Sequence, residues 1–207
     1  MVDVKGVIIM EQVLILGLDI HGIELAGRIT QLAKVAFMGF VATNADKDSY
    51  GGFPVYTPDV ALSRFPDAGF IPLHVWREAR DPFADKWISH VDPTCVISPG
   101  AVIGPGCVLY PNAFVGANAR LERGVFALSG CIINHDCVVG ERAVLTSGVT
   151  LAGSVHVGAG AYLGQSATVR QQLRIGKGAF VGMGAVVTKD VPDGQTVAGN
   201  PARNFPR

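Results

Sequence analysis

An aliphatic residue recurs at every sixth position between residues 91 and 187, and this regularity constrains the fold more than any other feature of the chain. Sixteen of the seventeen positions carry a branched aliphatic side chain, and no insertion breaks the register. A helix repeats its apolar face every 3.6 residues and a strand every two, so a period of six fits neither element. The spacing is typical of a parallel β-helix made of hexapeptide repeats. The positions are Val91, Ile97, Ile103, Leu109, Val115, Leu121, Ala127, Ile133, Val139, Leu145, Leu151, Val157, Leu163, Val169, Ile175, Val181 and Val187.

Two neighbouring positions of the hexad support this interpretation. The residue two before the aliphatic position is mostly small, and the residue after it is often glycine. We expect each hexad to supply one short strand and one corner, and three hexads to close a triangular coil. The aliphatic and small residues would point inward, and the glycine would tolerate the corner backbone. These glycines are Gly104, Gly116, Gly140, Gly158, Gly164, Gly176 and Gly182.

The four cysteines all fall in the small inward position of the hexad. Cys95, Cys107, Cys131 and Cys137 are separated by whole multiples of six residues. We therefore expect buried, reduced thiols that fill space in the core. The pattern indicates neither a disulfide framework nor a zinc site, and it disfavours a catalytic cysteine.

The first part of the chain lacks the period of six. We predict three segments: a small α/β unit over 1–88, the β-helix over 89–190 and a C-terminal tail over 191–207. Within the first segment, the pattern predicts strands over 13–16, 35–41 and 70–73 and a helix over 23–32.

The turn between the first strand and the helix carries glycine at both ends, Gly17 and Gly22. Rossmann-like folds hold a phosphate at such a turn, although the full G-x-G-x-x-G pattern is absent here. The other interpretation is a tight turn in which His21 is simply an N-terminal residue of the helix.

Composition excludes several classes of function. Seventeen basic residues balance seventeen acidic ones, which disfavours nucleic acid as a partner. The longest apolar stretch, over 7–16, is interrupted by Glu11 and Gln12 and is shorter than the roughly 20 residues of a membrane span. Because no basic leader with a cleavage site precedes it, we expect no membrane association and a cytoplasmic location. Met10 is an alternative start of the chain.

The outward positions of the hexads offer no clear catalytic candidates except around His135 and Asp136. Histidine is suited to proton transfer near neutral pH, and a neighbouring carboxylate can hold its tautomer and stabilise the imidazolium. The alternative is a solvated surface histidine beside a surface acid. His90 and His156 share a different position of the hexad, which is more typical of packing or surface residues.

Three motifs together resemble a known family. They are G-x-x-x-H-G at 17–22, I-x-H-D-C-x-x-G at 133–140 and V-x-G-N-P-A-R at 197–203. With the hexads, they resemble the bacterial sugar acyltransferases typified by sialic acid O-acetyltransferase and UDP-4-amino-sugar N-acetyltransferase. The resemblance covers nearly the whole chain. It implies a Rossmann-like N-terminal domain, a left-handed β-helix, a homotrimer with active sites between protomers, and acetyl-CoA in the groove between neighbouring helices.

The resemblance also implies roles for individual residues. His135 would be the general base, with Asp136 orienting its imidazole. The acetyl-CoA contacts would come mainly from the backbone, and the cations would lie near the polyanionic phosphates; the alternative for both cations is a solvated surface charge. No metal is implied. The predicted acetyl-CoA residues are Gly148, Gly164, Ala167, Lys189 and Arg203, and the predicted sugar-binding residues are Gly17, Asp19, His21 and Gly22.

This chain departs from the family pattern in three places. The second strand of the family ends in an acidic pair that helps to hold the nucleotide, whereas here Ala42-Thr43-Asn44 follows. Leu73-His74 replaces the usual G-N or G-D turn after the third strand. Near the base, Leu128 replaces a common asparagine, and Val144 replaces a histidine that often contacts CoA.

The leading hypothesis is an acetyl-CoA-dependent enzyme that acetylates an amino or hydroxyl group of a nucleotide-linked sugar, in polysaccharide or glycoconjugate synthesis. A smaller, non-nucleotide acceptor is the alternative within enzymes. A zinc lyase of the γ-carbonic anhydrase type shares the β-helix but needs three converging histidines, and His135 and His156 occupy different positions of the hexad. A non-catalytic β-helix trimer is the remaining alternative.

Overall fold

The computed structural model describes residues 12–32, 35–43, 46–78 and 80–205. The apolar stretch over 7–10 and the alternative start at Met10 lie outside these residues. The chain divides into two compact units, Met1–His90 and Val91–Arg207. Within the described ranges, no helix is long and apolar enough to cross a membrane.

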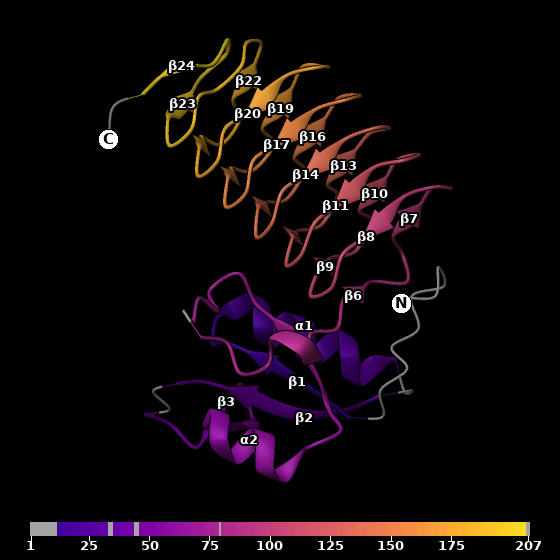
Figure 1. Cartoon of the computed structure of the whole chain (residues 1–207), viewed down its shortest axis with the longest axis vertical. Helices are drawn as coiled ribbons and strands as arrows, with labels where there is room; N and C mark the ends of the chain where they lie inside the picture. The colour runs from indigo at the N-terminus through magenta and orange to yellow at the C-terminus, as the bar shows by residue number, and fades with distance from the viewer. Residues whose placement is uncertain (1–11, 33–34, 44–45, 79, 206–207) are drawn as a thin grey trace. The chain divides into compact units, whose positions relative to one another are not determined.

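The N-terminal unit is built on a five-stranded sheet with the order β3-β4-β2-β1-β5 (Figure 1). The strands run parallel except β3, which pairs antiparallel with β4. Strands β3 and β4 and helix α2 were not predicted, because they are too short to show a hydrophobic period. The elements are β1 (Gln12–Leu16), α1 (Ile20–Gln31), β2 (Ala36–Val41), β3 (Ser49–Tyr50), β4 (Phe53–Tyr56), α2 (Pro58–Arg64), β5 (Gly69–Pro72) and the 3-10 helix η1 (Ala84–Lys86).

Helix α1 begins at Ile20, three residues before its predicted start, so the predicted turn over 17–22 is wrong in its second half. The cause is Asp19, which has an extended backbone and accepts a hydrogen bond from the Gly22 N–H through Oδ1 at 2.9 Å. An aspartate in this position is an N-cap, which satisfies one of the free N–H groups of the first helical turn. His21 is consequently a residue of the first turn of α1.

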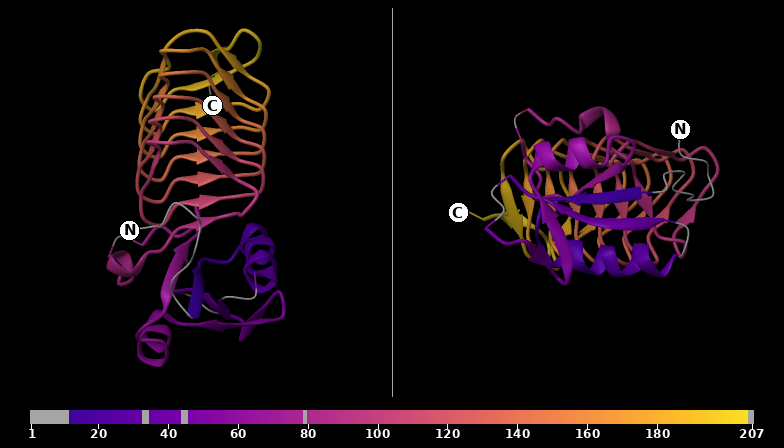
Figure 2. Two further views of the ribbon diagram at one scale, coloured as in Figure 1. Left: turned by 90° about the vertical axis from the view of Figure 1, so that its right-hand side faces the viewer. Right: turned by 90° about the horizontal axis from the view of Figure 1, so that it is seen from below.

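The second unit is a β-solenoid whose two-residue strands stack coil upon coil (Figures 1 and 2). Up to β22 the strands pair in parallel at a spacing of 18 residues, as Phe114 does with Ile132. At the C-terminal end, β21 pairs in parallel with β23 only 16 residues further on, and β24 pairs antiparallel with β23. The strands form three sheets, which we call the β13 face, the β14 face and the β12 face. A core of buried aliphatic side chains runs through the solenoid between them.

The three faces contain the following strands. The β13 face contains β7 (Val96–Ile97), β10 (Phe114–Val115), β13 (Ile132–Ile133), β16 (Thr150–Leu151), β19 (Thr168–Val169) and β22 (Val186–Val187). The β14 face contains β8 (Val102–Ile103), β11 (Arg120–Leu121), β14 (Val138–Val139), β17 (His156–Val157) and β20 (Arg174–Ile175). The β12 face contains β6 (His90–Val91), β9 (Val108–Leu109), β12 (Phe126–Ala127), β15 (Val144–Leu145), β18 (Tyr162–Leu163), β21 (Phe180–Val181), β23 (Thr196–Ala198) and β24 (Arg203–Asn204).

The sixth-position residues form the core, as predicted. From Leu109 onward all of them are buried, and the three that precede Leu109 are half-buried against the same cluster. Each fully buried aliphatic side chain contributes about 1.5–3 kcal/mol to stability. All four cysteines are free thiols, and the predicted burial is confirmed for Cys107, Cys131 and Cys137, whereas Cys95 is only half-buried. Burial raises the pKa of Cys107 and Cys131 to about 12 and that of Cys95 to about 11.

The glycines after the aliphatic positions have a different role from the one predicted. Gly116 is not among the residues with a positive φ, so corner backbone is not what requires it. A Cβ at Gly116 would instead lie 2.6 Å from the backbone nitrogen of His135 in the next coil. These glycines allow successive coils to approach closely, whereas the left-handed corners lie two residues further on, as at Asn118.

Candidate active site

His135 and Asp136 lie directly after β13, on the edge where the β13 face meets the β14 face. Asp136 has a φ of 57°, a left-handed conformation that aspartate, asparagine and glycine adopt more readily than other residues. We call this line of corners the His135 edge, and its successive corner residues are Gly100, Asn118, Asp136, Ser154 and Gln172.

The two side chains form an exposed pair. His135 Nδ1 lies 2.8 Å from Asp136 Oδ2, and the side chains are 64% and 52% exposed. Hydrogen bonds from His135 and then Asn118 lower the pKa of Asp136, so its carboxylate is ionised at neutral pH. An ionised carboxylate can only accept, so the proton of the pair lies on Nδ1 and the imidazole lone pair lies on Nε2. This arrangement suits His135 to act as a base toward an incoming ligand.

Asn118 is a third member of the site, one coil before Asp136. Its Nδ2 donates to Asp136 Oδ1 at 3.2 Å, so the two carboxylate oxygens have different partners. The backbone N–H of Asp136 donates to Ala117 O at 2.9 Å and holds the two corners together. Sequence reasoning missed Asn118, because it considered only residues close to His135 in the chain. The available signal was the coil length, since 136 minus 118 is 18.

Gly153 lies beside His135 in the following coil. A Cβ at this position would lie 2.5 Å from His135 Nε2 and 2.6 Å from Cε1. The backbone of the two coils is tied here, because Ser154 N–H donates to His135 O at 2.9 Å. The absence of a side chain at 153 therefore makes room for the reactive side of the imidazole.

The predicted acetyl-donor residues Gly148, Gly164 and Ala167 lie on or next to another edge, between the β12 and β13 faces. Gly148 occupies a left-handed corner with a φ of 72°. Ala167 is fully buried in the solenoid core, so only its backbone can face a ligand. One chain does not bring these residues together with His135, because the two edges flank opposite sides of the β13 face.

Lys189 and Arg203 are brought together by the structure. Both are exposed, and both line a pocket of about 260 Å³ near the C-terminal end of the solenoid, together with Asp190. Arg203 Nη1 donates to Ala202 O at 2.9 Å. The pocket offers two cations to an anionic ligand.

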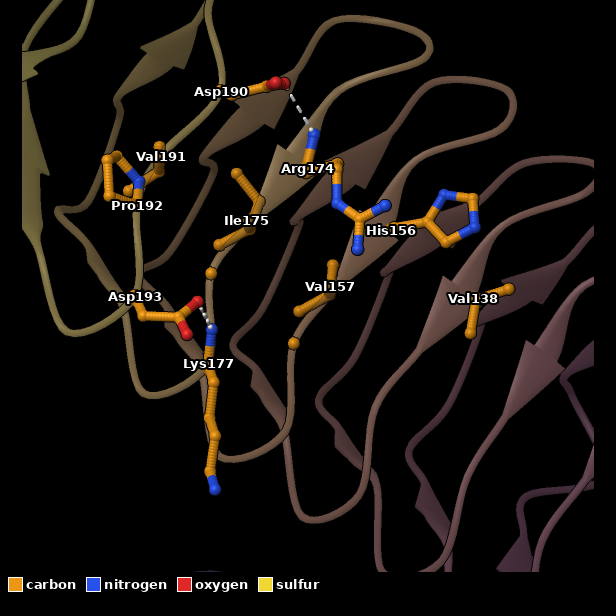
Figure 3. A pocket seen from close by; sticks show the side chains of 12 residues that line it. Val138, His156, Val157, Arg174, Ile175, Lys177, Asp190, Val191, Pro192 and Asp193 are labelled. Atoms are coloured by element: carbon orange, nitrogen blue, oxygen red, sulfur yellow. Dashed lines mark hydrogen bonds between the residues drawn. The ribbon is translucent and has the colours of Figure 1, made fainter.

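A larger pocket of about 450 Å³ lies on the β14 face (Figure 3). His156 and Arg174 project from successive strands, with Val138 at one end and Lys177 at the next corner. The carboxylates of Asp190 and Asp193 also line it and accept hydrogen bonds from the backbone N–H groups of Arg174 and Lys177, at 2.9 and 2.8 Å. Sequence reasoning did not find this pocket, whose residues come from four successive coils.

The predicted sugar-binding residues Gly17, Asp19, His21 and Gly22 lie together after β1. Gly17 has a φ of 100°, and its N–H donates to Val41 O at 2.9 Å. A Cβ at Gly22 would lie 2.9 Å from Leu73 Cδ1, so packing alone requires a glycine there.

A second histidine–aspartate pair lies in this unit. His74 Nδ1 is 3.4 Å from Asp19 Oδ2, with side chains 25% and 17% exposed. Burial lowers the pKa of His74. The rings of His74 and His21 are 5.8 Å apart between centroids. His74, seen in the sequence only as a departure from the family pattern, therefore lies beside two of the predicted ligand residues.

The end of β2 acquires a carboxylate from another segment. Thr43 Oγ1 donates to Glu78 Oε1 at 2.5 Å. The loop after β5 thus supplies an acidic group where the residues following β2 are uncharged; Asn44 lies outside the described residues.

The sequence also singled out Leu128 and Val144 as positions near the base, but they lie on or next to the β12 face and not on the His135 edge. Leu128 and Val144 are buried, with 7% and 4% of their surface exposed. Among the residues that the structure describes, no group of three or more histidine, cysteine, aspartate or glutamate side chains could hold a metal ion.

Comparisons with known proteins place this geometry in context. No family model matches the sequence, and no curated protein matches it. The acetyltransferase domain of PglB from Neisseria gonorrhoeae, solved in complex with acetyl coenzyme A, is 28% identical with a TM-score of 0.86, covering 95% of this chain and 100% of that one.

Two other solved structures extend the likeness. PerB from Caulobacter crescentus, in complex with CoA and GDP-perosamine, is 25% identical with a TM-score of 0.81 and covers 94% of this chain and 97% of that one. WeeI from Acinetobacter baumannii is 25% identical with a TM-score of 0.60 and covers 93% of this chain and 99% of that one. The resemblance seen in the sequence motifs is confirmed, because the fold and its structural neighbours fit the hexapeptide-repeat acyltransferases.

Proposed function

We propose that this protein is an acetyl-CoA-dependent acetyltransferase that acts on an amino group of a nucleotide-linked sugar. The observation that carries the proposal is the exposed His135–Asp136 pair, whose Nε2 lies beside Gly153. The likeness to the acetyltransferase domain of PglB over 95% of the chain supports the donor. The likeness to PerB, solved with GDP-perosamine, supports a sugar acceptor and favours an amine over a hydroxyl.

His135 performs the proton transfers in this mechanism. Its Nε2 takes a proton from the acceptor nitrogen as that nitrogen forms a bond to the acetyl carbonyl carbon of the thioester. Asp136 stabilises the imidazolium through the 2.8 Å contact to Nδ1. The carbon–sulfur bond then breaks, and the imidazolium returns its proton to the leaving thiolate. The products are an N-acetyl sugar and free CoA.

In this proposal, one copy of the chain binds the acetyl end of the donor and another copy supplies the base. Gly148, Gly164 and the Ala167 backbone line the acetyl and pantetheine portion, and Lys189 and Arg203 bind phosphates in their shared pocket. A single chain holds Gly148 and His135 on different edges of the solenoid. A homotrimer with its active sites between protomers accounts for this separation, because the edge of one copy then meets the edge of the next.

The N-terminal unit holds the acceptor in this proposal. Gly17, Asp19, His21 and Gly22 lie at the carboxyl end of β1, where Rossmann-like sheets bind ligands. The parallel order β4-β2-β1-β5 supports a Rossmann-like unit. We assign substrate binding to 1–88, transfer to a left-handed solenoid over 89–190, and a tail to 191–207. Glu78, which accepts a hydrogen bond from Thr43 just after β2, supports a nucleotide-linked acceptor, since a carboxylate there can accept from ribose hydroxyls.

A smaller, non-nucleotide acceptor is the second candidate. The uncharged residues Ala42 and Thr43 after β2 favour it, because the family holds its nucleotide there with acids from the strand itself.

Calorimetry and turnover test the proposal together. Acetyl-CoA and a panel of UDP- and GDP-linked amino sugars are titrated separately into the purified protein, and transfer is followed by release of the CoA thiol. We expect both ligands to bind and His135→Ala to lose at least a hundredfold in kcat, as expected for loss of a general base. His156→Ala is the matched control, since His156 is also an exposed solenoid histidine.

The possible results distinguish the hypotheses. Binding of acetyl-CoA without any response to nucleotide sugars would support the smaller, non-nucleotide acceptor. Failure to bind acetyl-CoA rejects the transferase, and equal loss of turnover in both histidine variants rejects His135 as the base.

A further inference from the structure

The side chain of Asn118 lies between two neighbouring corners of the His135 edge and is hydrogen-bonded to one of them. Its Nδ2 faces Asp136 Oδ1 at 3.2 Å in the following coil. Its Oδ1 lies over Gly100 in the preceding coil, where a Cβ would be only 2.5 Å away. A larger residue at 100 would displace the amide, so Gly100 makes room for Asn118 as Gly153 does for His135.

This anchoring decides which way the Asp136 carboxylate faces. Because Oδ1 is held by Asn118, Oδ2 remains directed at His135 Nδ1, 2.8 Å away. Both side chains are exposed, so no surrounding core restricts the rotation of the carboxylate. A hydrogen bond to a charged group is among the stronger polar interactions that a side chain can make.

The orientation of the carboxylate sets the tautomer of the base. The nitrogen of a histidine that carries the proton is decided by the hydrogen bond that the ring makes. A carboxylate at Nδ1 places the proton there and leaves the lone pair on Nε2, which lies beside Gly153. If the carboxylate turned away, the proton could move to Nε2 and the imidazole could no longer accept one there.

We infer that Asn118 is a positioning residue of the transferase, which fixes the Asp136 carboxylate so that neutral His135 carries its proton on Nδ1. The inference rests on the proposed function for its consequence in turnover. It goes beyond the pair itself, because it adds a residue from the preceding coil that does not touch the reacting atoms.

The competing explanation is purely conformational. Asn118 has a φ of 58°, and asparagine is favoured in left-handed backbone whether or not its side chain is used. Asn118→Gly separates the two explanations, since glycine adopts this backbone without strain and removes the side chain with its donor. Asn112→Gly is the matched control, because Asn112 has a φ of 63° at a corner of another edge.

The test measures the tautomer and the kinetics on the full-length protein. Long-range proton–nitrogen spectra of histidine-labelled protein report which ring nitrogen is protonated, and His135→Gln identifies the signals of His135. We expect Asn118→Gly to reduce the Nδ1–H fraction of neutral His135. We also expect kcat to fall about tenfold, the size expected for one lost hydrogen bond to a charged group, with the KM for acetyl-CoA within about twofold. Asn112→Gly should change neither quantity.

A second variant keeps the test decisive if the glycine variant is unstable. Asn118→Asp has nearly the same shape and tolerates the same backbone, but it replaces the donor with a second carboxylate. It should reduce the Nδ1–H fraction in the same way. An unchanged tautomer and an unchanged kcat in the Asn118 variants would overturn the inference, and so would equal losses in Asn118→Gly and Asn112→Gly.

The failures of the two proposals are distinguishable. If the wild-type protein transfers no acetyl group, the proposed function fails, while the tautomer measurement still decides whether Asn118 positions His135. If the wild type is active and Asn118→Gly leaves the tautomer unchanged, only the positioning role is lost.

Discussion

Each of the two units contains a histidine–aspartate pair, and the two pairs are built in opposite ways. In the solenoid, His135 and Asp136 are 2.8 Å apart and more than half exposed. In the N-terminal unit, His74 and Asp19 are 3.4 Å apart and mostly buried. The second oxygen of Asp136 accepts from a side chain, Asn118, whereas the second carboxylate oxygen of Asp19 caps helix α1.

The difference shows how surroundings decide the use of the same two side chains. Burial lowers the pKa of His74 and so favours its neutral form, against the attraction of the Asp19 carboxylate. Asp19 is committed to the start of a helix, and its removal should appear as lost stability. Asp136 supports nothing but its partners on the solenoid surface, so its removal should appear as lost turnover.

The largest expected effect is on Asp136. Asp136→Asn keeps the left-handed corner but removes the charge that stabilises the His135 imidazolium. We expect kcat to fall about a hundredfold, within the range of a general base that loses its partner, while the melting temperature stays unchanged. Thiol-release kinetics and a thermal melt measure both. A large loss of stability would break the comparison, because it would make Asp136 a structural residue like Asp19.

Gly153→Ala sharpens the role of exposure at His135. The added methyl would lie 2.5 Å from Nε2, but an exposed imidazole can swing aside at little cost. We expect kcat to fall about tenfold or more, because a base displaced by about 1 Å loses its alignment, with little change in the free energy of unfolding.

The control for this variant is Gly27→Ala in α1. A Cβ there would have no neighbour within 4 Å, and alanine is the better helix former. Activity should be retained and stability should rise. A similar loss of kcat in both variants would refute the steric account of Gly153.

Alkaline pH should act on the solenoid through its thiols. The pKa of Cys107 and Cys131 is raised by burial from 9.0 to about 12. Their contribution to stability is therefore complete below about pH 9 and is lost as the pH rises toward 12. Each thiol should lower the free energy of unfolding by about 1.4 kcal/mol per pH unit in that window.

Denaturant unfolding of wild type and of Cys107→Ala/Cys131→Ala between pH 8 and pH 11 measures this slope. Alanine already occupies the same position at Ala113 and Ala119, so the variant should fold. Parallel pH dependences of the two proteins would exclude the thiols as the cause.

The smallest expected effect is on Asp19. Asp19→Ala removes the N-cap of α1 and should cost about 1 kcal/mol of stability. Asp19→Asn keeps the cap and removes only the interaction with His74, so it should cost less. Urea unfolding compares the two variants, and equal costs would show that the pair with His74, and not the cap, is what Asp19 provides.

The sequence predicted the solenoid well because one physical requirement repeats without interruption. A residue such as Leu145 is buried for the same reason as its equivalents one coil away, so every coil repeats the same sequence signal. The N-terminal unit has no repeated signal of this kind. Strand β4 is four residues long and contains Pro54, so nothing in its period separates it from a loop.

The candidate site was predicted only where its residues are neighbours in the chain. His135 and Asp136 stand out as adjacent residues, whereas Asn118 contributes from the preceding coil and Gly153 from the following one. The role of Gly116 was misjudged for the same reason: its constraint is the backbone of His135 one coil away, which no local turn preference reveals.

Because the register is unbroken between residues 91 and 187, the separation of two residues in the sequence gives their distance along the solenoid axis. Parallel strands stack about 4.8 Å apart, and Lys189 stands 54 residues after His135, three times 18, in the same position of the hexad. Base and cation are therefore about 14 Å apart along the solenoid axis. Gain or loss of 18 residues would change that spacing by one coil while leaving every inward column in phase. The spacing between base and cation can thus change only in steps of one coil if the core is to stay unchanged.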